Sequence, residues 1–158
     1  MGFDGVILLD NRLDDGKTKN CIGKFKSLTD FISKFETMDS FGEWSGGEGE
    51  GTRESPLTMP WVNYCEDVHN FLRTFYKFSD KNPDYCLTRY SDILVSYNLK
   101  WGADSLITAD VDLLPAECIL AMIMGVIRGD RFSEGALLSF FKNGCMLRWL
   151  KRLEELER

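Results

Sequence analysis

Residues 113–127 read LLPAECILAMIMGVI and are apolar on almost every face of a helix. A helix that is hydrophobic all round has to be surrounded by other elements, so this run predicts a buried central helix. It is too short to cross a bilayer, which takes roughly 20 apolar residues, and it contains Pro115 and Glu117. We expect the helix to begin at Asp112, to carry Pro115 in its first turn and to end near Arg128.

The chain becomes abruptly polar at residues 128–135, which read RGDRFSEG. Charges at the exit of a buried helix are costly unless they pair or bind something. Arg128 and Arg131 flank the start of a following helix, for which Ser133 is the expected cap, and a helix start offers unpaired N–H donors. Arg128, Arg131 and Ser133 therefore form a candidate site for a phosphate or carboxylate.

The carboxylates of the same stretch allow two interpretations. Asp130 and Glu134 could act as acid and base beside a bound anion. Alternatively, they pair with Arg128 and Arg131 in an internal ion-pair corner that fixes how two helices meet. We favour the ion-pair corner, because structural ion pairs are common and nothing else in the sequence assembles a pocket around these residues.

Composition narrows the range of partners. The 158 residues are 44% hydrophobic, enough for one domain core, and 25 Asp and Glu outnumber 19 Lys and Arg, giving a net charge of −6. This balance opposes attraction to nucleic acid or to an anionic membrane surface. The start of the chain lacks the basic and apolar regions of a signal peptide. We expect a cytoplasmic protein with neither nucleic acid nor membrane as its partner.

The cysteines and the single histidine indicate neither a disulfide framework nor a metal site. The five cysteines are odd in number, widely spaced and never in a CxxC pair. His69 has no cluster of further ligands, and no glycine-rich phosphate loop is present, so we expect no metal and no cofactor. Cys65 and His69 are four residues apart and resemble a minimal thiolate and base, but structural roles are the better interpretation.

Apolar residues at helical spacing predict a mainly α fold. The expected helices lie, besides the central one, at residues 28–38, 62–77, 83–97, 133–142 and 145–157. A strand is the alternative over residues 87–97, which contain several residues that favour sheets. We expect a compact single-domain bundle of five to six helices. It would have an irregular N-terminal arm with a short strand over residues 1–25, a mobile Gly/Glu-rich loop over 45–58 and a helical core over 59–158.

Several motifs resemble an uncharacterised prokaryotic family of domains of unknown function, family 6508, mainly over residues 59–158. They are FGEW (41–44), MP (59–60) before a helix, ADVD (109–112), IRGDRFSEG (127–135) and LKRLEEL (150–156). The resemblance implies a prokaryotic cytoplasmic protein and carries no established activity. Similar proteins often have cysteine where Ser133 stands, so a thiol role at that position does not transfer.

Two functions are consistent with these observations. The first is a helical domain that acts through protein contacts without catalysis, with a protein partner or a second copy of itself, through the exposed parts of the C-terminal helix. The second is an anion- or nucleotide-binding protein, or an enzyme, with its site at Arg128–Glu134. The first is preferred because no catalytic triad, metal set or cofactor loop is recognisable.

Overall fold

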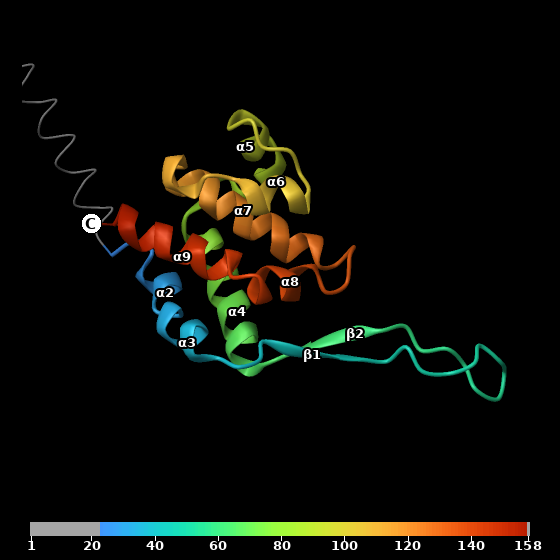
Figure 1. The fold of residues 1–158 in the computed structure, drawn as a ribbon. Helices are drawn as coiled ribbons and strands as arrows, with labels where there is room; N and C mark the ends of the chain where they lie inside the picture. The colour runs from blue at the N-terminus through green and yellow to red at the C-terminus, as the bar shows by residue number, and fades with distance from the viewer. Residues whose placement is uncertain (1–22, 158) are drawn as a thin grey trace, which may run out of the picture.

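The central helix of the fold is α7, Ala116–Gly129, in the computed structural model, which describes residues 23–157 (Figure 1). Ten consecutive residues of α7 are buried, so the buried central helix is confirmed. Its neighbours are α5 (Tyr90–Ser96), α8 (Ala136–Lys142) and α9 (Cys145–Leu156).

The start of α7 differs from the expected one. The helix begins at Ala116 rather than at Asp112, and Pro115 precedes it as an extended N-cap residue. A proline disfavours helical geometry in the residue before it, and Leu114 is accordingly extended, with ψ of 139°. Asp112 belongs instead to a separate 3-10 turn, η3 (Val111–Leu113).

The N-terminal helices cover one side of α9. The helix expected over residues 28–38 is divided into α2 (Lys26–Thr29) and α3 (Ile32–Thr37), and both pack against α9. The long helix α4 (Glu66–Lys81) packs against α2. Segments from the two ends of the described chain therefore lie side by side (Figure 1).

Phenylalanine rings connect these helices to α8. The ring of Phe35 from α3 lies 5.0 Å from that of Phe141 in α8 and 5.5 Å from that of Phe71 in α4, measured between centroids. Phe41 stacks on Phe141 at 4.9 Å. Edge and offset contacts of this kind add to the hydrophobic stabilisation of a core. These ring contacts position the segment in which the chain leaves the helices after α3.

There the chain forms an antiparallel β-hairpin, which we call the hairpin and define as residues 42–64. Strands β1 (Gly42–Ser45) and β2 (Trp61–Tyr64) pair with Trp44 opposite Val62. The hairpin extends away from the helices into open space (Figure 1).

Backbone hydrogen bonds continue beyond the two strands into the segment expected as a loop over residues 45–58. The N–H of Gly47 donates to the carbonyl of Thr58 at 2.8 Å, and the N–H of Thr58 donates to the carbonyl of Glu48 at 2.9 Å. Near the tip, the N–H of Glu50 donates to the carbonyl of Ser55 at 3.1 Å. The Gly/Glu-rich segment thus prolongs the hairpin.

The helix expected over residues 62–77 is wrong at its start. Residues 61–64 form β2, Cys65 is the extended N-cap residue, and α4 begins at Glu66. Val62 and Cys65 fall by chance at helical spacing from Val68, but their backbone pairs with β1 and with Phe41, respectively.

The remaining elements follow the expected order with shifted ends. Residues 87–96 are helical, as a 3-10 turn η2 (Leu87–Arg89) followed by α5, and not a strand. A short helix, α6 (Ala103–Thr108), was not expected, and a further 3-10 turn, η1 (Pro83–Tyr85), follows α4. The mainly α architecture is confirmed, with one continuous core of buried hydrophobic residues. Most of the expected N-terminal arm lies outside the described residues.

No helix within residues 23–157 is both long and apolar enough to span a membrane.

Candidate functional site

The candidate residues lie in or next to the turn between α7 and α8, residues 130–135, which we call the corner turn. One oxygen, Asp130 Oδ1, accepts three hydrogen bonds: from the Tyr64 hydroxyl at 3.0 Å and from the N–H groups of Gly135 and Leu137 at 3.1 Å each. A carboxylate at this position accepts hydrogen bonds from N–H groups in the first turn of α8 that have no partner within the helix. Its negative charge also interacts favourably with the positive end of the helix dipole. Asp130 therefore caps α8.

Tyr64 completes this cap from the end of β2. Its hydroxyl donates to Asp130 and accepts the N–H of Leu138 at 3.1 Å. Burial, followed by the charge and hydrogen bond of Asp130, raises the pKa of Tyr64 above its ordinary value. Tyr64 therefore stays a neutral hydrogen-bond donor and joins the hairpin to the start of α8.

Glu134 and Gly135 hold the base of the hairpin from the other side of the corner turn. Glu134 Oε1 accepts the N–H of Val62 at 2.8 Å. Gly135 has φ of +89°, and a Cβ there would lie 2.3 Å from Cζ2 of Trp44. Only glycine combines this left-handed backbone with such a close indole. The corner turn is thus the attachment site of the hairpin.

Ser133 does not have the expected role. The N-cap residue of α8 is Gly135, which has no side chain with which to cap the helix. The Ser133 carbonyl accepts the N–H of Ala136 at 3.0 Å. Helix α8 therefore begins three residues later than expected, because Asp130 supplies the cap from the preceding turn.

The ion-pair corner is wrong. Within residues 23–157, neither Arg128 nor Arg131 makes an ion pair. The carboxylates of Asp130 and Glu134 instead accept hydrogen bonds from backbone N–H groups and Tyr64. Asp110, near the other end of α7, accepts the N–H of Asp112.

The two arginines lie in different surroundings. Arg128 is half-buried, and its buried Nε has no hydrogen-bond partner among residues 23–157, whereas Arg131 is exposed. The donors that an anion would need from α8 are already used by Asp130 and Tyr64. Anion binding by Arg128, Arg131 and Ser133 stays a prediction, but the helix N–H groups that motivated it are no longer available to an anion. Acid–base chemistry at Asp130 and Glu134 also stays a prediction.

Cys65 and His69 do not form a thiol–base pair. In the described part of the chain their side chains share no hydrogen bond, and the exposed His69 ring instead meets the edge of Tyr64, with centroids 6.4 Å apart. No group of three or more potential metal ligands occurs among residues 23–157. Burial raises the pKa of the Cys118 thiol in α7 to about 11, which disfavours the reactive thiolate.

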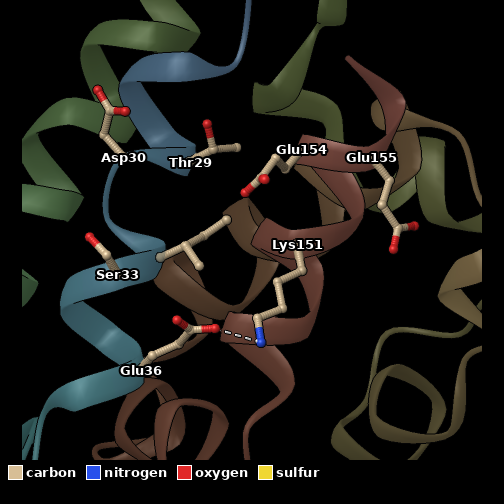
Figure 2. Close-up of a pocket in the computed structure, with 8 residues that line it drawn as sticks. Thr29, Asp30, Ser33, Glu36, Lys151, Glu154 and Glu155 are labelled. Carbon is tan, nitrogen blue, oxygen red and sulfur yellow. Dashed lines mark ion pairs between the residues drawn. The ribbon is translucent and has the colours of Figure 1, made fainter. Parts of the chain in front are cut away.

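An acidic hollow with a volume of about 520 Å³ lies between α2, α3 and α9. Figure 2 shows Lys151 reaching across to Glu36, where Nζ and Oε1 are 2.7 Å apart. Asp30, Glu154 and Glu155 lie around the same opening (Figure 2). Because exposed ion pairs contribute little free energy, the Lys151–Glu36 pair adds little to stability. The hollow is a charged surface between the helices.

A smaller apolar hollow of about 250 Å³ adjoins the corner turn and has no charged side chain in its lining. Its floor includes Trp101, whose indole lies across two glycines of α7. A Cβ at Gly125 or Gly129 would stand 2.5 Å or 2.9 Å from this ring. Phe132, which is 90% exposed, forms part of the rim. The apolar hollow is lined mainly by Tyr90, Trp101, Leu106, Val126, Phe132 and Phe140.

Sequence reasoning missed Trp44, Val62 and Tyr64 as partners of the corner turn. The signal available was the alternation of residues 61–64 after Pro60, which fits a short strand as well as a helix. The spacing of Gly125 and Gly129 on one face of α7 also indicated a close neighbour.

Comparison with known proteins gives a family and no activity. No curated protein and no solved structure matches the chain. The model of the family of unknown function DUF6508 matches residues 23–158. This match includes the hairpin, the corner turn and the apolar hollow. The chain therefore belongs to the DUF6508 family of unknown function.

Proposed function

We propose that the chain is a protein-binding domain without catalysis, and that the hairpin is its contact surface. The observation that carries this proposal is the set of large apolar side chains that the hairpin exposes beyond the helices. Leu57 is 59% exposed, Met59 76% and Trp61 45%. Grouped exposed apolar residues on a projecting element are typical of interaction sites.

The hairpin is attached at three points, which favours recognition over a simple linker. Trp44 packs on Gly135, the Val62 N–H bonds to Glu134, and the Tyr64 hydroxyl bonds to Asp130. These contacts fix the direction in which the hairpin leaves the body. A surface held in one orientation loses less entropy on binding than a free loop does.

In the part of the chain that the structure describes, no helix packs against the outer part of the hairpin (Figure 1). A two-stranded hairpin is marginally stable on its own in water, and its strand edges can accept further pairing. A partner that covers the apolar side chains would stabilise it. This expected stabilisation of the hairpin by a bound partner supports a binding function there.

The C-terminal helix is a weaker candidate for this contact than expected. The apolar stripe of α9 faces the core, with Met146, Trp149, Leu150 and Leu153 all buried. Its exposed positions, such as Arg148, Lys151 and Glu155, are charged. We therefore place the proposed contact on the hairpin instead of α9.

We also propose that the domain works in the cytoplasm. Cys65, Cys86, Cys118 and Cys145 are free thiols, and free thiols fit a reducing compartment.

The test is position-specific photo-crosslinking in cells that naturally produce the protein. A photo-reactive amino acid replaces Met59, and a matched control replaces Leu113, which is 79% exposed on the distant turn η3. We expect discrete protein adducts from position 59 and none from position 113. A protein found in an adduct, or a second copy of the chain, is then purified and titrated.

The titration decides whether the adduct reflects binding. Leu57→Ser with Met59→Ser should weaken the purified complex by at least about tenfold, because apolar hot spots carry most of the affinity. Leu113→Ser should leave it unchanged. Equal crosslinking from positions 59 and 113, or equal affinity of all variants, would contradict the proposed function.

A further inference from the structure

We infer that the hairpin binds an extended, basic segment of its partner, and that this segment adds as a third strand along the outer edge of β1. This inference rests on the proposed function, which it extends by naming the chemistry of the partner and the way it is bound. Three observations carry it: a strand edge with unpaired backbone groups, a surplus of unpaired carboxylates and an exposed indole beside that edge.

The hydrogen-bond pattern of the hairpin shows which backbone groups face outward. The N–H of Cys65 donates to the Phe41 carbonyl at 3.0 Å, so these two residues form a hydrogen-bonded pair. Bonded and non-bonded pairs alternate along an antiparallel ladder, which makes Trp44 and Val62 a non-bonded pair. The Val62 N–H accordingly points away from β1 and donates to Glu134. Trp44 therefore turns its N–H and C=O groups away from β2.

The two edges of the ladder differ in their occupancy. On β2, Glu134 of the corner turn accepts the outward N–H of Val62. On β1, the Gly42 carbonyl accepts the Ser40 hydroxyl at 3.3 Å. No hydrogen bond among residues 23–157 reaches the outward N–H or C=O of Trp44. We call the outward backbone groups of Gly42 and Trp44 the open edge, and the occupant that matches them is another extended backbone.

The charge of the hairpin indicates the kind of strand that can add. The hairpin carries Glu43, Glu48, Glu50 and Glu54 against the single Arg53. None of these four carboxylates forms an ion pair within residues 23–157. A second hairpin would bring like charges together, whereas a basic strand would bring opposite charges together. The occupant is therefore a basic segment and not another copy of the hairpin.

The base of the hairpin does not cancel this surplus of negative charge. At the end of α7 and in the corner turn, Asp130 and Glu134 equal Arg128 and Arg131 in number. Before β1, Asp39 adds a further exposed carboxylate. The approach to the open edge is thus acidic, which favours the encounter with a basic segment.

The two faces of β1 determine the order of side chains in the added strand. Trp44 faces the body, where its indole packs on Gly135, and Glu43 faces the opposite side. Trp44 is nevertheless 51% exposed, and Glu43 is exposed as well. Cross-strand neighbours on one face contact each other. The residue beside Trp44 should therefore be apolar and the residue beside Glu43 basic, so a segment of alternating basic and apolar residues fits both.

The first experiment adds short synthetic peptides to the full chain and follows hydrogen exchange at the Trp44 backbone amide. Selective nitrogen-15 labelling of the four tryptophans gives one backbone signal for each, and Trp44→Phe assigns the signal of Trp44. At millimolar concentration, a peptide of alternating lysine and valine should slow exchange at Trp44 by at least about tenfold. Trp101, which lies before α6, is the internal reference and should keep its exchange rate.

Modified peptides test whether backbone hydrogen bonds hold the added strand. The residue opposite Trp44 forms a hydrogen-bonded pair with it, so the valine amides of the peptide face the open edge. N-methylation of the valine amides should abolish the protection of Trp44. N-methylation of the lysine amides, which face away, is the matched control and should preserve it. Equal protection by the two methylated peptides overturns strand addition.

A peptide of alternating glutamate and valine tests the charge of the partner. It keeps every backbone donor and acceptor and reverses only the side-chain charge, so it should leave exchange at Trp44 unchanged. Equal protection by the glutamate and lysine peptides overturns the basic partner.

A charge reversal tests the role of Glu43 in the protein. Glu43→Lys should weaken binding of the lysine–valine peptide by at least about fivefold. Asp80→Lys makes the same change of charge at an exposed position in the last turn of α4 and should leave the affinity within about twofold of the wild type. Equal affinities of the two variants overturn Glu43 as a recognition group.

The outcomes separate this inference from the proposed function. If the lysine–valine peptide at millimolar concentration does not protect Trp44, strand addition at the open edge is overturned. Crosslinks from position 59 to a protein partner would then still leave the proposed function standing. Protection of Trp44 without any crosslink from position 59 would instead overturn the proposed contact at Met59 and support the added strand.

Discussion

The Tyr64 hydroxyl donates a 3.0 Å hydrogen bond to Asp130 Oδ1 although the two residues are 66 positions apart in the sequence. This contact joins the last residue of β2 to the first residue of the corner turn. Through it, the hairpin and the cap of α8 form a single hydrogen-bonded unit.

Tyr64→Phe should reduce stability. The change leaves the Leu138 N–H without an acceptor and removes one of the three donors to Asp130. We expect the free energy of unfolding in urea to fall by about 1–2 kcal/mol. Tyr97→Phe is the control, because its exposed hydrogen bond to Glu117 should be worth less than about 0.5 kcal/mol. Equal effects of the two substitutions would contradict a structural role for the Tyr64 hydroxyl.

The same tyrosine should make the protein sensitive to alkaline pH. Its folded-state pKa is raised above the ordinary value of about 10, so the unfolded chain loses this proton first. The contribution of Tyr64 is therefore fully present below about pH 10 and is lost as pH rises toward the folded-state pKa. The free energy of unfolding of the wild type should fall more steeply above about pH 10 than that of Tyr64→Phe. Parallel pH curves from urea titrations would argue against this coupling.

Gly135→Ala should release the base of the hairpin. The new Cβ would meet the Trp44 indole at 2.3 Å, and the position also has φ of +89°. Gly144→Ala is a matched control, since Gly144 has φ of +82° and no atom within 4 Å of the corresponding Cβ. Both variants should lose about 1 kcal/mol through backbone strain. Only Gly135→Ala should lose more than this in its free energy of unfolding and also show a change in tryptophan fluorescence.

Asp130 and Arg131 should differ sharply in their importance for stability. Asp130→Ala removes the cap of α8 and the partner of Tyr64, so we expect a loss of about 2 kcal/mol or more in the free energy of unfolding. Arg131→Met affects an exposed side chain without an ion pair among the described residues, and should change it by less than about 0.5 kcal/mol. A large loss from Arg131→Met would restore the ion-pair interpretation.

Anion binding at Arg128 and Arg131 can be tested by thermal shift. A ligand that binds the folded state raises Tm in proportion to its occupancy. Because the N–H donors at the start of α8 are already engaged, we expect phosphate, nucleotides and carboxylates to shift the wild type and Arg131→Ala equally. A shift that the wild type shows and Arg131→Ala lacks would favour an anion site.

The buried helix could be predicted from sequence because its signal is local. Ten consecutive buried residues leave no face for polar side chains, so α7 was evident from composition alone. The hairpin was not evident, because β2 pairs with β1 across a long glycine-rich segment. Local spacing cannot reveal such a distant partner, and Val62 and Cys65 happened to continue the period of α4.

The corner turn could be recognised from sequence as a structured turn, but its contacts could not be predicted. The cost of charge at the exit of α7 correctly marked the corner turn as a structured position. Because Arg128 and Arg131 are close to Asp130 in sequence, an ion pair between Asp130 and an arginine was the expected contact. In the fold, a distant hydroxyl and two backbone N–H groups are better placed, because the turn directs the carboxylate toward the start of α8.

The three attachments of the hairpin to the corner turn make tolerance to insertions uneven along the chain. An added residue between Asp130 and Gly135 would displace the Asp130 cap, the glycine under Trp44 and the Phe132 rim together. An added pair of residues near the hairpin tip would only lengthen a solvent-exposed ladder. Length variation should therefore be accepted at the tip and rejected at the turn, which marks the turn as the wrong place for a tag or a graft.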